Sequence, residues 1–197
     1  MRSSEGARLP FLRLALSGEA GLLLLAWGLS RWLQLTPFSY LQPDGATLLW
    51  GLAAAIPLMA GLAWMLSSTW GPVRGLVALV VERLGALLAG QSVAGLAALA
   101  IVAGVSEEVL FRGVIQPGLT RWMPAGLALL ATSLLFGLVH FASRSYAVMA
   151  SIMGLYLGIL FQLTGNLLAP VVAHATYDFV ALLWVSRIGA ASVDPDR

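Results

Sequence analysis

The chain has 197 residues, of which 59% are hydrophobic and only 10% are charged, and its mean hydropathy is +0.89. In soluble domains roughly a quarter of the residues are charged, so this composition excludes an ordinary soluble protein and indicates an integral membrane protein. The net charge of +2 comes from scattered arginines, which excludes the basic stripe of a nucleic-acid-binding protein, and the absence of cysteine excludes disulfides and thiolate chemistry.

The apolar stretches predict an all-α protein, a polytopic transmembrane helical bundle that forms a single domain over residues 1–197. A spanning helix needs about 20 apolar residues, so the chain has room for about six spans with short connections. Hydropathy and the Pro, Gly, Ser or Arg residues at the ends of each stretch predict spans at 12–33, 46–66, 93–115, 124–141, 146–163 and 167–185.

The segment 73–88 differs from the predicted spans because Arg74, Glu82 and Arg83 interrupt its apolar pattern. We expect this segment to form a helix that lies in the membrane interface. The alternative is a seventh span, which would move the C-terminus to the other side of the membrane.

The arginines near the predicted spans are distributed unequally between the two sides of the membrane. In a six-span arrangement, Arg31 and Arg121 lie on one side. The other side holds Arg2, Arg8, Arg13, Arg74, Arg83, Arg144 and Arg187. The positive-inside rule then places both termini in the cytoplasm. Because Arg replaces every Lys, we expect a bacterial protein that lies in the cytoplasmic membrane, in contact with lipid. The sequence does not indicate its oligomeric state.

Ionisable side chains fall inside three of the predicted spans, where a charge is costly and by default marks a functional site. In the segment 106–112, helical geometry puts Glu108 and Arg112 on one face, in the favourable order for an ion pair. We interpret these two as a structural ion pair and expect Glu107, which has no local partner, to be available for chemistry. The alternative is two acids near water at a helix end.

The two histidines of the chain lie on the other two spans of this group. His140 ends the fourth span, with Phe136 one turn before it, and His174 lies within the sixth span, with Asp178 one turn after it. A lone His in an apolar helix is more often a hydrogen-bonded packing residue than a ligand. Lipid would nevertheless force all these groups to face inward, so we expect them to converge on one site with Glu107.

Such a set of acids and imidazoles could hydrolyse a bond, with Glu107 as the general base toward water and His140 as the group that shares or orients the proton. His174 and Asp178 could stabilise the developing oxyanion. A zinc or another divalent metal is an alternative, with ligands from Glu107, His140, His174 and Asp178. An ionised carboxylate cannot donate a hydrogen bond, so we expect Asp178 to orient His174 or to bind metal. A metal-free mechanism is equally compatible with the sequence, which has no HExxH motif.

Three motifs in this order resemble those of the CAAX protease and bacteriocin-processing family of intramembrane proteases, also called the CPBP or Abi family, which is related to type II CAAX prenyl endopeptidase. Residues 107–112 match the EExxxR motif, residues 136–140 match FxxxH, and residues 174–178 match HxxxN/D. The similar region covers about 87–184, which we expect to be the catalytic core.

The resemblance implies a membrane-embedded peptidase of the glutamate or metallo-endopeptidase type. It implies that Glu107 activates water with His140 as its partner, and that His174 and Asp178 surround the scissile carbonyl or a metal. Eukaryotic relatives tend to carry Asn at the position of Asp178, and Asn can donate to an oxyanion where Asp cannot. The implied substrate is a peptide or membrane protein, such as a bacteriocin-type leader, because bacteria generally lack prenylated CAAX proteins.

Two other classes of protein are compatible with the same residues. One is a non-catalytic membrane adaptor or bacteriocin-immunity protein that keeps the fold without turnover. The other is a proton-coupled transporter, since buried Glu, Asp and His form proton relays in carriers. Carriers usually show inverted repeats and broken helices, and neither is visible in the sequence.

Overall fold

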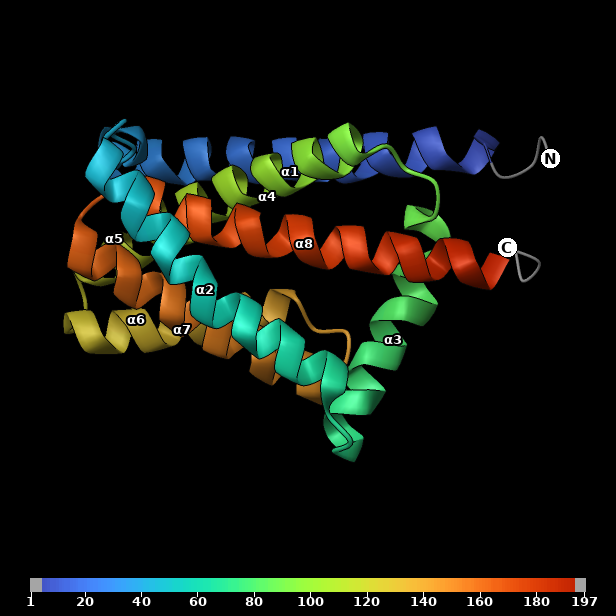
Figure 1. The fold of residues 1–197 in the computed structure, drawn as a ribbon. Helices are drawn as coiled ribbons and strands as arrows, with labels where there is room; N and C mark the ends of the chain where they lie inside the picture. Colours follow the sequence, from blue (N-terminus) through green and yellow to red (C-terminus); the bar gives the residue numbers. More distant parts are fainter. Residues whose placement is uncertain (1–4, 194–197) are drawn as a thin grey trace.

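The computed structural model describes residues 5–193, with the side chains of 11–191, and the regular structure in this range is helical throughout (Figure 1). The elements are α1 (Glu5–Leu33), the 3-10 turn η1 (Pro37–Tyr40), α2 (Gly45–Ser67), α3 (Gly71–Leu88), α4 (Val93–Leu110), the π turn η2 (Phe111–Ile115), α5 (Gln116–Leu119), α6 (Ala125–Val139), α7 (Arg144–Thr164) and α8 (Leu168–Val193). The predicted all-α class is confirmed. Arg2 and the side chain of Arg8, which entered the predicted orientation, lie outside the described residues.

Five helical stretches are long and apolar enough to cross a membrane. They are Phe11–Leu33, Gly45–Ser67, Val93–Leu119, Arg144–Thr164 and Leu168–Ala191. They coincide with five of the six predicted spans, so the prediction of a polytopic helical membrane protein is confirmed. The third stretch is longer than predicted because α4, η2 and α5 follow one another without a break.

The remaining predicted span, 124–141, corresponds to the short helix α6. This helix has 15 residues, which at 1.5 Å per residue gives about 22 Å, less than the ~30 Å hydrocarbon core of a bilayer. Pro124 precedes its first turn, and His140 caps its end. Ser143 then begins α7, because its hydroxyl accepts a hydrogen bond from the Tyr146 backbone N–H. The histidine therefore lies at a helix junction instead of inside a span.

Helix α3 runs across one end of the bundle, at a steep angle to α8 (Figure 1). It packs against α8 and buries Val73, Leu76, Gly85 and Leu88. Its three charged residues Arg74, Glu82 and Arg83 are exposed. α3 is not among the five stretches that could span a membrane, and this arrangement is the one expected of an interfacial helix.

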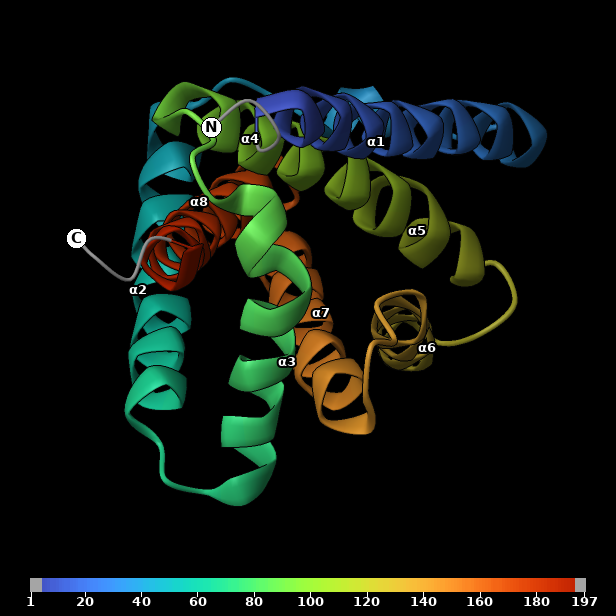
Figure 2. The same ribbon diagram turned by 90° about the vertical axis from the view of Figure 1, so that its right-hand side faces the viewer.

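Helix α8 lies at the centre of the bundle. It packs against α2, α3, α4 and α7, and Figure 2, which looks nearly along α8, shows these helices around it. Glycine permits a close approach of α4 to α8: a Cβ added at Gly104 of α4 would lie 3.1 Å from the Cβ of Ala175 and 3.2 Å from the carbonyl oxygen of Val171. Two of the helices that carry polar motifs, α4 and α8, are thus in direct contact, whereas α6 packs mainly on α7.

Candidate active site

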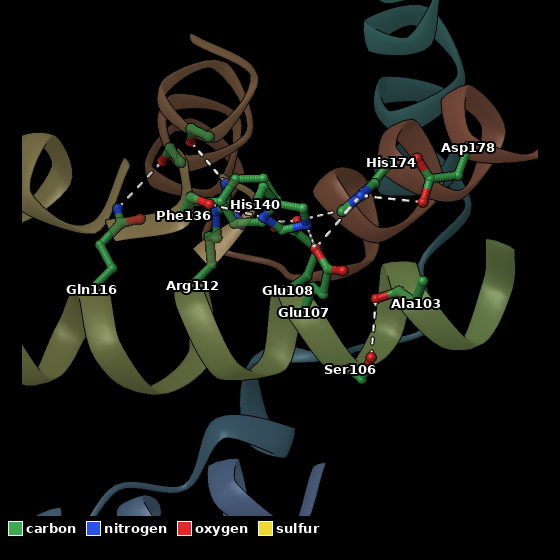
Figure 3. A network of polar contacts seen from close by, with 12 residues as sticks. Ala103, Ser106, Glu107, Glu108, Arg112, Gln116, Phe136, His140, His174 and Asp178 are labelled. Atoms are coloured by element: carbon green, nitrogen blue, oxygen red, sulfur yellow. Dashed lines mark hydrogen bonds and ion pairs between the residues drawn. The ribbon is translucent and has the colours of Figure 1, made fainter. Parts of the chain in front are cut away.

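The polar residues singled out in the sequence come together in the interior of the bundle (Figure 3). Helix α4 supplies Glu107 and Glu108, the turn η2 supplies Arg112, the residue after α6 is His140, and α8 supplies His174 and Asp178. Their convergence follows from the cost of exposing them to lipid, as the sequence predicted.

Arg112 and Glu108 form the buried centre of this group. Arg112 Nη1 lies 3.0 Å from Glu108 Oε1, and the two side chains are 1% and 0% exposed. The other guanidinium nitrogen, Nη2, donates to the carbonyl oxygen of Gly154 on α7 at 2.9 Å. The guanidinium also lies 4.7 Å above the ring of Phe136, a favourable cation–π position. The ion pair thereby connects α4 to α6 and α7.

Arg112 lies in a π turn, the local feature that interrupts α4. The backbone N–H of Phe111 is shared between the carbonyl oxygens of Glu107 and Glu108. Insertion of one extra residue per turn re-aims the side chains that follow, and such turns are frequent at functional sites. The sequence does not signal this turn, because it contains no proline and its glycine, Gly113, is one of many within the predicted spans.

His174 is fixed by Glu108 as well as by its own helix. Its Nδ1 lies 2.8 Å from Glu108 Oε1. Arg112 holds Glu108 as an anion, so Nδ1 carries the proton and donates to it, which leaves Nε2 free to face the site. The sequence placed Glu108 only in the ion pair with Arg112 and missed this second contact, which joins residues on different helices.

His140 is oriented in the same way by its own helix. Its Nδ1 lies 2.8 Å from the carbonyl oxygen of Phe136, and its ring stacks on the ring of Phe136 at 4.4 Å between centroids. A carbonyl oxygen can only accept, so Nδ1 donates and Nε2 is again left facing the site.

Glu107 lies between the two imidazoles. Its Oε2 is 3.5 Å from His140 Nε2 and 3.9 Å from His174 Nε2, yet it is buried without a hydrogen-bond partner among the described residues. Buried polar atoms are nearly always paired. Three acceptor atoms therefore surround a space that suits a species with protons to donate, such as a water molecule.

Asp178 lies on the same side of His174 as Glu107. Its Oδ2 is 3.5 Å from His174 Nε2, so it does not hold the Nδ1 atom, where Glu108 is found instead. Asp178 and His140 are the open members of the group, with side chains 27% and 28% exposed, whereas His174 is 4% exposed.

The same four residues, Glu107, His140, His174 and Asp178, are of types that can bind a metal ion. Carboxylate oxygens and imidazole nitrogens are suitable zinc ligands. In the part of the chain that the structure describes, no group of three or more such side chains is arranged to hold a metal ion.

The site opens into a cavity of about 220 Å³. Glu107, His140, His174 and Asp178 line one part of it. The other walls are apolar and come from four helices, with Leu62 and Met65 from α2, Leu76 and Val80 from α3, Met149 and Met153 from α7, and Leu182 from α8. The polar group therefore faces a space suited to a long apolar side chain.

The structure adds one acid that the sequence analysis did not single out. Glu19 of α1 accepts a hydrogen bond from the hydroxyl of Ser106, the residue before Glu107. Glu19 lies inside the first predicted span, where an acidic residue is rare, and this position could have identified it from the sequence. This contact links α1 to α4 at the residue before Glu107.

Fold and site together define a class of protein. It is a polytopic helical membrane protein with a buried centre of acids and imidazoles beside an apolar cavity. Residues 89–180 match the model of the family described as "Type II CAAX prenyl endopeptidase Rce1-like". This segment carries all three motifs and is similar to that family, so the resemblance predicted from the sequence is confirmed.

One curated relative is similar to part of the chain. It is "Uncharacterized protein YpbD" of Bacillus subtilis (strain 168), which is 33% identical over 85 residues, or 42% of this chain and 41% of YpbD. The chain thus spans less than half the length of the curated relative it matches. No solved structure matches the chain significantly.

Proposed function

We propose that this chain is an endopeptidase that hydrolyses a peptide bond within the membrane, with water as the nucleophile. The observation that carries the proposal is Glu107, whose buried Oε2 has no hydrogen-bond partner among the described residues and faces two imidazole Nε2 atoms. A general base needs such a position, within reach of a water and free of other bonds. The family match over residues 89–180 supports the same class of activity.

In the proposed reaction, a water molecule lies between Glu107 Oε2 and His140 Nε2, and Glu107 accepts one of its protons. The water oxygen forms a bond to the carbonyl carbon of the peptide, and the carbonyl electron pair moves onto the carbonyl oxygen. When this intermediate collapses, the C–N bond breaks and the leaving nitrogen takes the proton from Glu107. His140 orients the water and shares the proton through Nε2. A positioned base of this kind contributes about 10²–10⁴-fold to the rate.

The remaining residues hold this arrangement in place. Arg112 fixes Glu108, and Glu108 fixes the Nδ1 side of His174, so that His174 Nε2 is aimed at the reacting atoms. Asp178 lies beside that nitrogen, on the open side of the site. We assign His174 and Asp178 to the surroundings of the scissile carbonyl, and Glu108 with Arg112 to positioning.

The cavity indicates the class of substrate. Its walls beyond the polar group are apolar and include several flexible Met side chains, which adapt to ligands of varied shape. We propose a peptide or membrane-protein segment with a large apolar side chain next to the cleaved bond. A bacteriocin-type leader is the example that the family resemblance suggests.

The central test is cleavage of a peptide library by the purified protein in lipid nanodiscs, with products identified by mass spectrometry. Glu107→Gln and His140→Ala should each lower cleavage by about 10²–10⁴-fold. Glu82→Gln is a matched control, because Glu82 is exposed on α3, and it should cleave like the parent. Cleavage in H₂¹⁸O should place one ¹⁸O in the new carboxyl group.

Undiminished cleavage by Glu107→Gln would refute the proposal. Proton-coupled flux in liposomes without proteolysis would favour a transporter, and full biological complementation by Glu107→Gln would favour an adaptor or immunity protein. Metal assistance is decided in the same assay. Loss of cleavage on chelation, with recovery on adding zinc, would give the ion a part in activating water, and cleavage that persists would assign this part to Glu107 alone.

A further inference from the structure

The proposed reaction calls for hydrogen-bond donors at the carbonyl oxygen of the cleaved bond, in addition to His174, which we assign to the surroundings of that carbonyl. Negative charge develops on the carbonyl oxygen, and preorganised donors aimed at it are commonly the largest source of rate enhancement. Glu107 and Asp178 are acceptors when ionised. The Nδ1–H groups of His140 and His174 are engaged by Phe136 and Glu108.

Two tyrosines bring hydroxyl groups to the same cavity. Tyr146 comes from the first turn of α7 and Tyr177 from α8, and both line the cavity beside Glu107 and Asp178. Neither hydroxyl has a hydrogen-bond partner among the described residues. Tyr156 provides a contrast, because its hydroxyl donates to the carbonyl oxygen of Ala54 at 2.8 Å and so has a structural role.

The surroundings of the two tyrosines distinguish them. Tyr146 lies in the first turn of α7, directly after the short connection that begins at His140. Tyr177 lies on α8, next to Asp178 in the sequence and on the helix that carries His174. Tyr146 is also fixed to the helix junction that carries His140, because its backbone N–H donates to the hydroxyl of Ser143.

We propose that Tyr146 is a further catalytic residue, which donates its phenolic O–H to the carbonyl oxygen of the scissile bond as that oxygen becomes an anion. The inference rests on the proposed peptidase function. Tyr146 keeps its proton throughout: the hydrogen bond strengthens when the carbonyl electron pair moves onto oxygen, and it weakens when the C=O bond re-forms and the C–N bond breaks. The arrangement also suits a chain that has Asp178, since a carboxylate cannot donate there.

The test compares single hydroxyl deletions in the full-length protein in nanodiscs. Tyr146→Phe keeps the ring and removes only the donor, and it should lower kcat by about 10²–10³-fold with little change in KM, the loss typical of one oxyanion donor. Tyr40→Phe is the matched control, because Tyr40 packs on Phe161 and does not line the cavity, and it should leave kcat close to the parent value. Tyr177→Phe, from the same cavity as Tyr146, should lower kcat much less than Tyr146→Phe. Thermal unfolding of the three variants checks that the fold is kept.

A binding measurement supports the kinetic one without turnover. A peptide phosphinate, whose tetrahedral oxygens mimic the intermediate, should bind Tyr146→Phe more weakly by a similar factor, whereas the matching uncleaved substrate should bind equally well. A merely structural tyrosine would change both affinities together.

The outcomes separate this inference from the function on which it rests. Parent-like kcat in Tyr146→Phe, with cleavage still abolished by Glu107→Gln, would overturn the role of Tyr146 and leave the peptidase intact. A large loss in Tyr177→Phe in place of Tyr146→Phe would also overturn it. Cleavage that survives Glu107→Gln would overturn both.

Discussion

Removal of either member of the buried ion pair should destabilise the protein, and by unequal amounts. Arg112 and Glu108 are almost fully buried, with 3.0 Å between Nη1 and Oε1. Breaking a buried pair by deleting one partner typically costs about 3–5 kcal/mol, because the other charge is left uncompensated. Total stabilities are only about 5–15 kcal/mol, so Glu108→Ala and Arg112→Ala should mainly reduce the yield of folded protein.

The contacts of each partner predict which variant loses more free energy of unfolding. Without Arg112, the Glu108 carboxylate still accepts a hydrogen bond from His174 at 2.8 Å. Without Glu108, the guanidinium keeps the carbonyl oxygen of Gly154 and the rings of Phe136 and Phe111, and His174 Nδ1 also loses its partner. Because Glu108→Ala takes the acceptor from two buried groups, we expect it to be the less stable variant, by the cost of roughly one unsatisfied buried donor, about 1–3 kcal/mol.

Unfolding by titration with a denaturing detergent, in matched micelles, would measure these differences. The double variant Glu108→Gln/Arg112→Met removes both charges with side chains of similar length, and it should be more stable than Glu108→Ala, since replacing a whole pair is often nearly neutral. If both single variants were within about 1 kcal/mol of the parent in stability, the reasoning would be refuted. Such small losses are typical of an ion pair that is screened by water.

Three further predictions concern the fold. Gly104→Val should lower stability by about 1–3 kcal/mol in the same titration, since its side chain would enter the contact between α4 and α8. The Asp44 carboxylate accepts from Thr47 at the start of α2, which lowers the pKa of Asp44. The Tm advantage of the parent over Asp44→Ala should therefore be present near neutral pH, above the unfolded-state pKa, and disappear as the pH falls through the lower folded-state value. Because the chain has no cysteine, single-cysteine labelling can test the orientation: Thr69→Cys should react only from the cytoplasmic side and Ser39→Cys only from the outside, and the reverse pattern would invert the predicted topology.

The sequence predicted those features that depend on local pattern. Five spans could be located because each is a continuous apolar stretch, and the pair Glu108 and Arg112 could be assigned because helical geometry fixes the neighbours of a residue four positions away. Lipid predicts the convergence of the polar groups, since the alternative is exposure to acyl chains. The short helix α6 was predicted as a span because its apolar stretch continues past the end of the helix at Val139, and hydropathy alone does not locate helix ends.

What the sequence could not predict are contacts between helices. The hydrogen bond from His174 to Glu108 depends on how α8 rotates against α4, a rotation set by small residues such as Gly104 and not by the polar motif itself. Glu19 reaches Ser106 for the same kind of reason. Motif spacing therefore identifies the participants of the site, while helix packing decides which atom of each one faces the reaction.

This division explains why the site combines rigid and open residues. Glu108, Arg112 and His174 are nearly inaccessible and have defined partners, so that one nitrogen of His174 is held in a fixed direction. His140 and Asp178 are more than a quarter exposed and border the cavity that α3 covers. A peptide that entered this cavity would meet Glu107 from the open side, with the fixed imidazole behind it. In the proposed reaction, the buried ion pair therefore acts through geometry: it connects α4 to α6 and α7, in the arrangement that places Glu107 between two imidazoles.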